Sequence, residues 1–243
     1  IALPLALGGL TKGVTNLELT NGFASIANGG THYKTSFYTK IYDHDGNLLL
    51  ENDNEGQQVM KESTAWLLTN AMEDVIKSGT ATKARFKKIS LAQAGKSGTT
   101  THNKDLWFVG YTPYLTGGVW SGYDDSSAQS SGSYTKEIWR TIMEQLSKKS
   151  KHKTFTKPSS ITTASIWSKC GKEYFDRENV PTENCDCHIK CQICSASGAL
   201  ANDRCPSYQV HTKIYLQKKE TSRTNDTPYV LPDALSHDTC HIH

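Results

Sequence analysis

The sequence has 243 residues, a formal net charge of +3 and 36% hydrophobic residues. This length suits one large domain or two smaller ones, and the charge is too small to indicate a nucleic-acid partner. No segment approaches the roughly 18–20 continuous apolar residues of a membrane span. The apolar opening at 1–10 has no basic stretch before it and does not resemble a signal peptide. Because the sequence begins without Met and in mid-pattern, we expect it to be a fragment of a longer protein.

The first 80 or so residues predict a helix, a hairpin and a second helix. Residues 14–30 have capping-box spacing at Thr15 and Glu18 and end in Asn-Gly-Gly, which stops a helix. Residues 35–51 alternate, turn at Asp-Gly-Asn and return as an apolar run, which predicts a hairpin. Residues 61–79 predict a helix with one apolar stripe, formed by Ala65, Leu68, Met72, Val75 and Ile76.

Three strands and a closing helix follow. The runs 89–101, 106–113 and 116–125 are rich in β-branched and aromatic residues and are punctuated by Gly, Pro and Asp. Residues 133–146 predict a helix that has Ser133 as its N-cap and carries an apolar stripe of Ile138, Ile142 and Leu146.

The composition changes after residue 147. The stretch 148–164 is basic and polar, which predicts a solvated linker; attraction to an anionic membrane or wall polymer is the alternative. The chain has seven cysteines, and none precedes Cys170. We therefore expect a first domain at 1–147, a linker at 148–164 and a Cys-rich extension at 165–243.

The tetrapeptide Lys-Ser-Gly-Thr occurs twice, at 77–80 and at 96–99. The first copy follows an amphipathic helix, where Gly79 fits a left-handed cap and Lys77 complements the helix dipole, so it has a structural explanation. The second copy lies in a strand-like run. The N–H groups of such a strand can hold an oxyanion, and a lysine beside them supplies a positive field. The alternative is a glycine-containing hairpin with a surface lysine.

Five ordered blocks extend this pattern: the stretch 5–30, which contains the first predicted helix, then "GTATKA", "AGKSGTT", "DLWFVGYTP" and "GVWSGYDD". Together they resemble the C-terminal part of the transpeptidase domain of class A (bifunctional) penicillin-binding proteins. The tail also resembles a Cys-bearing extension found in some members of that family. The resemblance implies an α+β fold, an incomplete serine β-lactamase/DD-transpeptidase-like antiparallel sheet flanked by helices. A small irregular or β-rich extension follows it.

The family's activity is acyl transfer, in which a serine attacks the D-Ala-D-Ala amide of a peptidoglycan stem peptide and β-lactams trap that serine. Carried onto this sequence, Lys96 supplies positive potential, and the Ser97 and Thr99 hydroxyls bind the terminal carboxylate of the substrate. The Thr99 N–H donates to the oxyanion, and Gly98 lets the substrate lie against the strand. Trp107 and Phe108 are expected to pack the sheet.

Two motifs of the family, Ser-x-x-Lys and Ser-x-Asn, should precede the Lys-Ser-Gly-Thr strand. The sequence has no Ser-x-Asn, and its two Ser-x-x-Lys matches, Ser133–Lys136 and Ser150–Lys153, both follow Lys96. Without a nucleophile we expect this chain alone to be inactive. The alternative function is that of a non-catalytic wall-binding or scaffold fragment.

The resemblance also implies partners and a location. The partners are peptidoglycan stem peptides and β-lactams, with no cofactor. The parent protein is expected at the extracytoplasmic face of the cell membrane, held there by a segment outside these residues.

The clustered cysteines allow three states: disulfides, a metal site or free thiols. Disulfides are favoured because the family acts outside the membrane. The alternative is a zinc site at Cys185, Cys187, Cys191 and Cys194, to which Cys205, Cys240, His241 and His243 could add. Among the other histidines, His102 lies just past the Lys96 strand and is a candidate border of the cleft.

Overall fold

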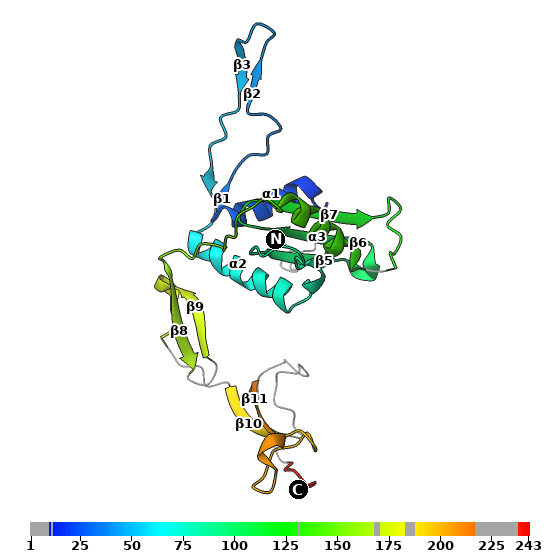
Figure 1. The fold of residues 1–243 in the computed structure, drawn as a ribbon, viewed down its shortest axis with the longest axis vertical. Coiled ribbons are helices and arrows are strands. Elements are labelled where there is room, and N and C mark those ends of the chain that lie inside the picture. Colours follow the sequence, from blue (N-terminus) through cyan, green and yellow to red (C-terminus); the bar gives the residue numbers. More distant parts are fainter. Residues whose placement is uncertain (1–9, 11, 131, 168–170, 183–187, 217–237) are drawn as a thin grey trace. The chain divides into compact units, whose positions relative to one another are not determined.

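A computed structural model describes residues 10, 12–130, 132–167, 171–182, 188–216 and 238–243. The chain divides into two compact units, residues 1–161 and 162–243. Strands occur in both expected domains, as Figure 1 shows, whereas the first unit holds all three α-helices of the described residues. None of these helices combines the length and apolarity that crossing a bilayer requires.

The first unit is built on a three-stranded antiparallel sheet in the order β5-β6-β7. The three strands are β5 (Ala94–Thr99), β6 (Asp105–Tyr111) and β7 (Thr116–Gly122). They confirm the three strands that the sequence predicted. Short turns join them in chain order, so that β5 and β7 form the two edges of this sheet (Figure 1).

Helices cover both faces of the sheet. A side chain at Gly117 would meet Trp139 and Met143 of α3 (Tyr134–Leu146), whereas one at Gly118 would meet Thr20 of α1 (Asn16–Ala27). Consecutive strand residues point to opposite faces. Helices α1 and α3 therefore pack on opposite faces of β7, which is the layered α+β arrangement expected.

Helix α1 begins and ends as its sequence predicts. The Thr15 hydroxyl accepts from Glu18 N and the Glu18 carboxylate accepts from Thr15 N, at 3.2 and 2.8 Å, which is the complete capping box. The helix ends at Asn28, after which Gly29 and Gly30 have φ values of +67° and +90°. Residues other than glycine rarely adopt this left-handed region. The two glycines after Asn28 therefore let the backbone turn away and end the helix.

Helix α2 (Glu62–Lys77) contributes to two apolar clusters. Met72 packs with Ala94 of β5 and Tyr111 of β6, and Ile76 packs with Phe108 and Trp139. Leu68, which we expected on the buried stripe, is instead exposed, and the polar Thr69 is buried in its place. The buried Thr69 hydroxyl is satisfied by a hydrogen bond of 2.7 Å with the Tyr111 hydroxyl, so a polar residue is accommodated on the face that Met72 and Ile76 pack against the sheet.

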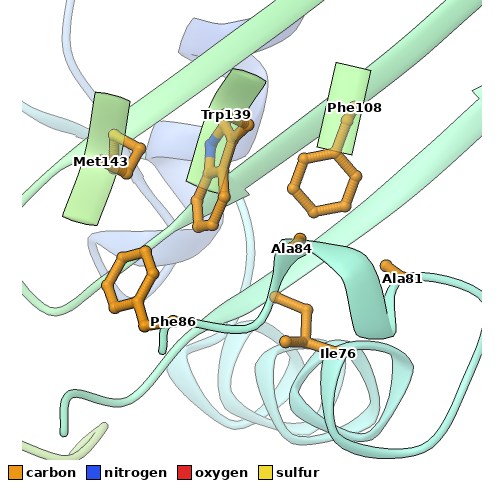
Figure 2. Packing of buried hydrophobic residues seen from close by; sticks show 7 residues of the cluster. All are labelled: Ile76, Ala81, Ala84, Phe86, Phe108, Trp139 and Met143. Atoms are coloured by element: carbon orange, nitrogen blue, oxygen red, sulfur yellow. The ribbon is translucent and has the colours of Figure 1, made fainter. Parts of the chain in front are cut away.

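The buried face of α3 also differs from the prediction. Trp139 and Met143 face the sheet, while Ile138, Ile142 and Leu146 are 43%, 51% and 62% exposed. Figure 2 shows Trp139 between Phe108 and Phe86. Ser133 occupies the predicted N-cap position, directly before Tyr134, but its side chain makes no cap hydrogen bond and its backbone angles are helical.

Two small antiparallel sheets complete the first unit. Strands β2 (Lys40–Tyr42) and β3 (Leu48–Glu51) form the predicted hairpin, and their side chains are exposed. Strands β1 (Thr31–His32) and β4 (Gln57–Gln58) pair near the end of α1.

Most side chains between 148 and 157 are exposed, as a solvated stretch predicts, but this segment belongs to the first unit and is not a free linker. Phe155 lies edge-on against Tyr111 at 5.5 Å, and Ala92 N donates to Lys153 O at 3.3 Å. The division between the two units falls after Ile161, where β8 begins.

The second unit contains two strand pairs. The first pair is β8 (Ile161–Trp167) with β9 (Gly171–Asp176), and the second is β10 (His188–Cys194) with β11 (Val210–Leu216). The second pair has its own apolar cluster, formed by Cys191, Ile193 and Tyr215.

Candidate functional site

The second Lys-Ser-Gly-Thr copy forms most of the edge strand β5. Ala94 and Gly95, at the start of the strand, are buried, whereas Lys96, Gly98 and Thr99 are exposed. A side chain at Gly95 would lie 2.9 Å from Gly110 Cα, so glycine at this position lets β5 and β6 approach closely. The strand thus changes from a packed start at 94–95 to an accessible tetrapeptide at 96–99.

The backbone of β5 presents peptide groups at its open edge. Thr100 N donates to Asp105 O at 3.1 Å, so this peptide N–H points towards β6. Successive residues of an antiparallel strand turn their N–H and C=O groups to opposite sides. The Thr99 N–H and the Ser97 peptide groups therefore point away from β6. The Lys96 ammonium donates to Ser97 O at 2.8 Å, which agrees with this direction.

The side chains of the tetrapeptide divide between the two faces of the sheet. The register pairs Gly98 with Trp107 and Thr99 with Leu106. A side chain at Gly98 would lie 3.3 Å from Trp107 Cβ, so Gly98 and Lys96 share the face of Trp107. Ser97 and Thr99 lie on the other face, because consecutive strand residues point to opposite faces.

The first copy of the tetrapeptide touches the second. The Thr80 hydroxyl lies 3.4 Å from the Ser97 hydroxyl. Lys77 ends α2 and lies 3.7 Å from both the Glu73 and the Asp74 carboxylates, in agreement with its expected place at the negative end of the helix. Sequence reasoning treated this copy as helix termination alone and therefore missed Thr80.

Gly79 does not have the left-handed conformation we expected. The residues of positive φ do not include it, and its role is steric. A side chain at Gly79 would lie 2.8 Å from Val75 Cα, so only glycine lets the chain turn back closely over the last turn of α2. That turn directs Thr80 towards β5.

Two further lysines extend the positive charge around Lys96. Burial lowers the pKa of Lys136, and the charges of Lys83 and Lys96 lower that pKa further. Lys83 also lies 3.6 Å from the Glu137 carboxylate. Lys136 belongs to the Ser-x-x-Lys match at 133–136, which follows Lys96 and is therefore not assigned to catalysis. The structure places it instead where it adds to the field around the strand.

The loop after β5 is tightly held. Asp105 accepts from the Thr100 hydroxyl at 3.1 Å and from Trp120 Nε1 at 3.0 Å, which ties the end of β5 to β7. His102 lies in the intervening turn with φ of +61° and is exposed. Phe108 is fully buried against Trp139, and Trp107 packs on Trp120, so both aromatic residues pack as expected.

Among the described residues, the structure groups one cysteine of the alternative zinc set, Cys194, with two of the residues that could add to it. Cys194 lies with Cys205 and Cys240 in a group whose sulfur atoms are all within 4.8 Å of one another. Cys191 instead joins an apolar cluster with Ile193. Cys185 and Cys187 lie outside the described residues.

The sheet, its covering helices and the exposed Lys-Ser-Gly-Thr edge define a partial α+β domain. A model of the penicillin-binding protein transpeptidase domain matches residues 3–144. The chain therefore belongs to the penicillin-binding transpeptidase family, and its resemblance to the class A members is confirmed.

Two curated relatives illustrate the similarity. The chain is 31% identical to penicillin-binding protein 1A of Clostridium botulinum, over 95% of this chain and 30% of that protein. It is 36% identical to penicillin-binding protein 1F of Bacillus subtilis, over 65% of this chain and 23% of that protein. The chain thus spans less than a third of the length of these relatives.

Solved structures show the same fold. Penicillin-binding protein 1A from Haemophilus influenzae matches with a TM-score of 0.61 and 21% identity, over 70% of this chain and 33% of that one. PonA1 from Mycobacterium tuberculosis matches with a TM-score of 0.53 and 27% identity, over 59% of this chain and 41% of that one. The expected α+β fold, with antiparallel sheets and part of a transpeptidase domain, is confirmed.

Proposed function

We propose that this chain forms the substrate-binding wall of a serine-type DD-transpeptidase that cross-links peptidoglycan. The observation that carries the proposal is the edge of β5, where the Thr99 N–H and the Ser97 peptide groups point away from β6. An extended peptide can add to such an edge through main-chain hydrogen bonds. The family's substrate, a stem peptide ending in D-Ala-D-Ala, has the extended shape that this mode of binding requires.

Each residue of the tetrapeptide then has a chemical role. The Thr99 N–H donates to the oxyanion that forms when the scissile carbonyl is attacked. The Ser97 and Thr99 hydroxyls bind the terminal carboxylate of the substrate, in the positive field of Lys96. Gly98 has no side chain and leaves room for the peptide on its face of the strand. The proposal makes no use of a metal or cofactor in this reaction.

The nucleophile has to come from elsewhere. The 243 residues contain no Ser-x-Asn and no Ser-x-x-Lys before Lys96. We assign the serine and its base to a part of the parent protein outside this chain. Membrane anchoring and a location at the extracytoplasmic face belong to the same proposal. Reading the coding sequence upstream of Ile1 for both motifs in frame is a direct check.

Fluorescent penicillin tests the proposal. We expect no covalent labelling of the 243-residue chain, because its sequence has no Ser-x-x-Lys motif before Lys96 to supply the nucleophile. The protein expressed with its upstream coding sequence should label, and unlabelled penicillin should compete. Labelling of the short chain would reveal a nucleophile within it. An unlabelled longer protein would favour the alternative of a binding or scaffold fragment.

Thr80 is expected to position Ser97. Replacing Thr80 with valine keeps the shape of the side chain but removes the hydroxyl 3.4 Å from Ser97 Oγ. Because a hydrogen bond of this kind contributes about 0.5–1.5 kcal/mol, we expect penicillin acylation of the longer protein to slow about 2- to 10-fold. Stopped-flow acylation kinetics measure this rate.

The matched control for this change is Thr82→Val, an exposed threonine two residues further along. It should leave the acylation rate and the free energy of unfolding unchanged. Equal rates for the Thr80 and Thr82 variants would contradict the role given to Thr80.

A further inference from the structure

Three separate segments of the second unit bring cysteines together. Cys194 ends β10, Cys205 lies in the following loop, and Cys240 lies in the segment 238–243. Their sulfur atoms are all within 4.8 Å of one another. Cys194 and Cys240 are 0% and 4% exposed, so two of the three thiols are withdrawn from solvent.

Backbone hydrogen bonds fix each of these segments. Cys194 N donates to Ala199 O at 3.0 Å, Cys205 N to Asn202 O at 3.1 Å and Cys240 N to Leu200 O at 2.7 Å. All three acceptors lie in the loop after β10, so one loop sets the positions of three thiols. Backbone hydrogen bonds therefore hold the three cysteines close together, and their grouping does not depend on side-chain rotamers alone.

Asn202 organises the group further. Its backbone N–H donates to Cys205 Sγ at 3.4 Å, and its side-chain amide donates to Cys240 O at 2.7 Å. These hydrogen bonds hold the Cys205 sulfur and the Cys240 backbone in place, and cysteine binds metals through its sulfur. Polar partners that orient the ligands in this way are typical of metal sites in proteins.

The spacing suits a tetrahedral metal ion. Zinc–sulfur bonds of about 2.3 Å at tetrahedral angles separate two thiolates by about 3.8 Å. The three sulfur atoms lie within 4.8 Å of one another, so small changes in side-chain conformation would let all three bind one ion. A disulfide would join only two of the three, because it requires a sulfur–sulfur bond of about 2.05 Å.

We propose that Cys194, Cys205 and Cys240 bind one zinc-class divalent cation through three thiolates, with a fourth position open to water or another ligand. This set replaces the zinc set considered from the sequence. Cys191 is three residues before Cys194 and therefore points to the opposite face of β10, where it packs with Ile193 and Tyr215. The Nε2 atom of His243 is hydrogen-bonded to Gln209 at 2.6 Å.

A bound metal ion would link β10 and the loop after it to the segment 238–243, which is distant in sequence. We therefore expect it to stabilise the second unit, since a ligand that binds only the folded state raises stability in proportion to the logarithm of its concentration. This inference does not rest on the transpeptidase function, and its test has no step that involves a β-lactam.

The experiment uses the 243-residue chain, purified with a reductant, loaded with zinc and desalted. Plasma mass spectrometry should find one zinc per chain. Cys194→Ala, Cys205→Ala and Cys240→Ala should each lose most of the bound zinc, whereas Cys191→Ala should retain it. Cys191 is the matched control because it is a buried cysteine of the same strand outside the group. Equal zinc in all four variants, or none in the unmodified chain, would overturn the proposal.

Two further measurements guard against loss of folding. Cobalt added to the unmodified chain should give a thiolate-to-cobalt charge-transfer band, and Cys205→His, which keeps a metal ligand, should retain bound metal while Cys205→Ala does not. Mass spectrometry without reductant gives the competing result. Quantitative formation of a Cys205–Cys240 or Cys194–Cys205 disulfide in the chain as isolated, with no metal uptake, would replace the metal site with a structural disulfide.

Discussion

Replacing Lys96 with alanine in the longer protein is expected to slow acylation by penicillin about 100-fold or more. The ammonium lies on the edge strand and donates to Ser97 O, beside the peptide groups proposed to bind the substrate. Its charge favours the carboxylate of the substrate and the oxyanion of the transition state. Removing that charge therefore raises the barrier to acylation.

The chain offers a matched control for this change. Lys77 occupies the same position in the first Lys-Ser-Gly-Thr copy, where it lies 3.7 Å from both the Glu73 and the Asp74 carboxylates at the end of α2. Lys77→Ala should leave acylation within about twofold of the unmodified protein, because exposed ion pairs contribute little. Stopped-flow measurement with fluorescent penicillin gives both rates. An unchanged rate for Lys96→Ala would remove this lysine from the mechanism.

Replacing Trp139 with alanine is expected to destabilise the first unit by about 3–5 kcal/mol. Trp139 is 1% exposed, packs edge-on against Phe108 at 5.1 Å and stacks on Phe86 at 5.8 Å (Figure 2). Its indole N–H lies 3.0 Å from Gly117 O and 3.3 Å from Gly110 O. The substitution removes both the packing and a donor to two strands of the sheet.

Urea unfolding followed by circular dichroism measures this change, since the loss of a tryptophan would alter a fluorescence signal directly. Ile142→Ala is the control on the same helix, because Ile142 is 51% exposed. It should change the free energy of unfolding by less than about 0.5 kcal/mol. A larger effect at Ile142 than at Trp139 would mean that α3 packs by its other face.

Structural features that depend on a few neighbouring residues could be predicted from the sequence. The capping box at Thr15 and the glycines after Asn28 act through neighbouring backbone groups, so their pattern determines the ends of α1. The strands β5, β6 and β7 were predicted for a similar reason, since Gly, Pro and Asp separate their β-forming runs. The family resemblance rested on the same ordered blocks.

Features that depend on distant partners could not be predicted in this way. Helix α3 has apolar residues on two faces, and Trp139 is turned inward because Gly110 and Gly117 leave room for its ring. The contact between Thr80 and Ser97 joins positions 17 residues apart through the packing of α2 on β5. The group of Cys194, Cys205 and Cys240 likewise forms only when the end of β10, the loop after it and residues 238–243 come together. Spacing along the chain offered a different zinc set, and only as the alternative to disulfides.

The edge position of β5 also bears on how this chain behaves in solution. A strand with an unpaired side can pair with the same strand of another molecule, which leads to aggregation. Lys96 carries a positive charge on that strand, and two copies brought side by side would bring two such charges together. The lysine proposed to attract a substrate carboxylate therefore also opposes self-association of the edge, so the binding strand stays available to a peptide of opposite charge.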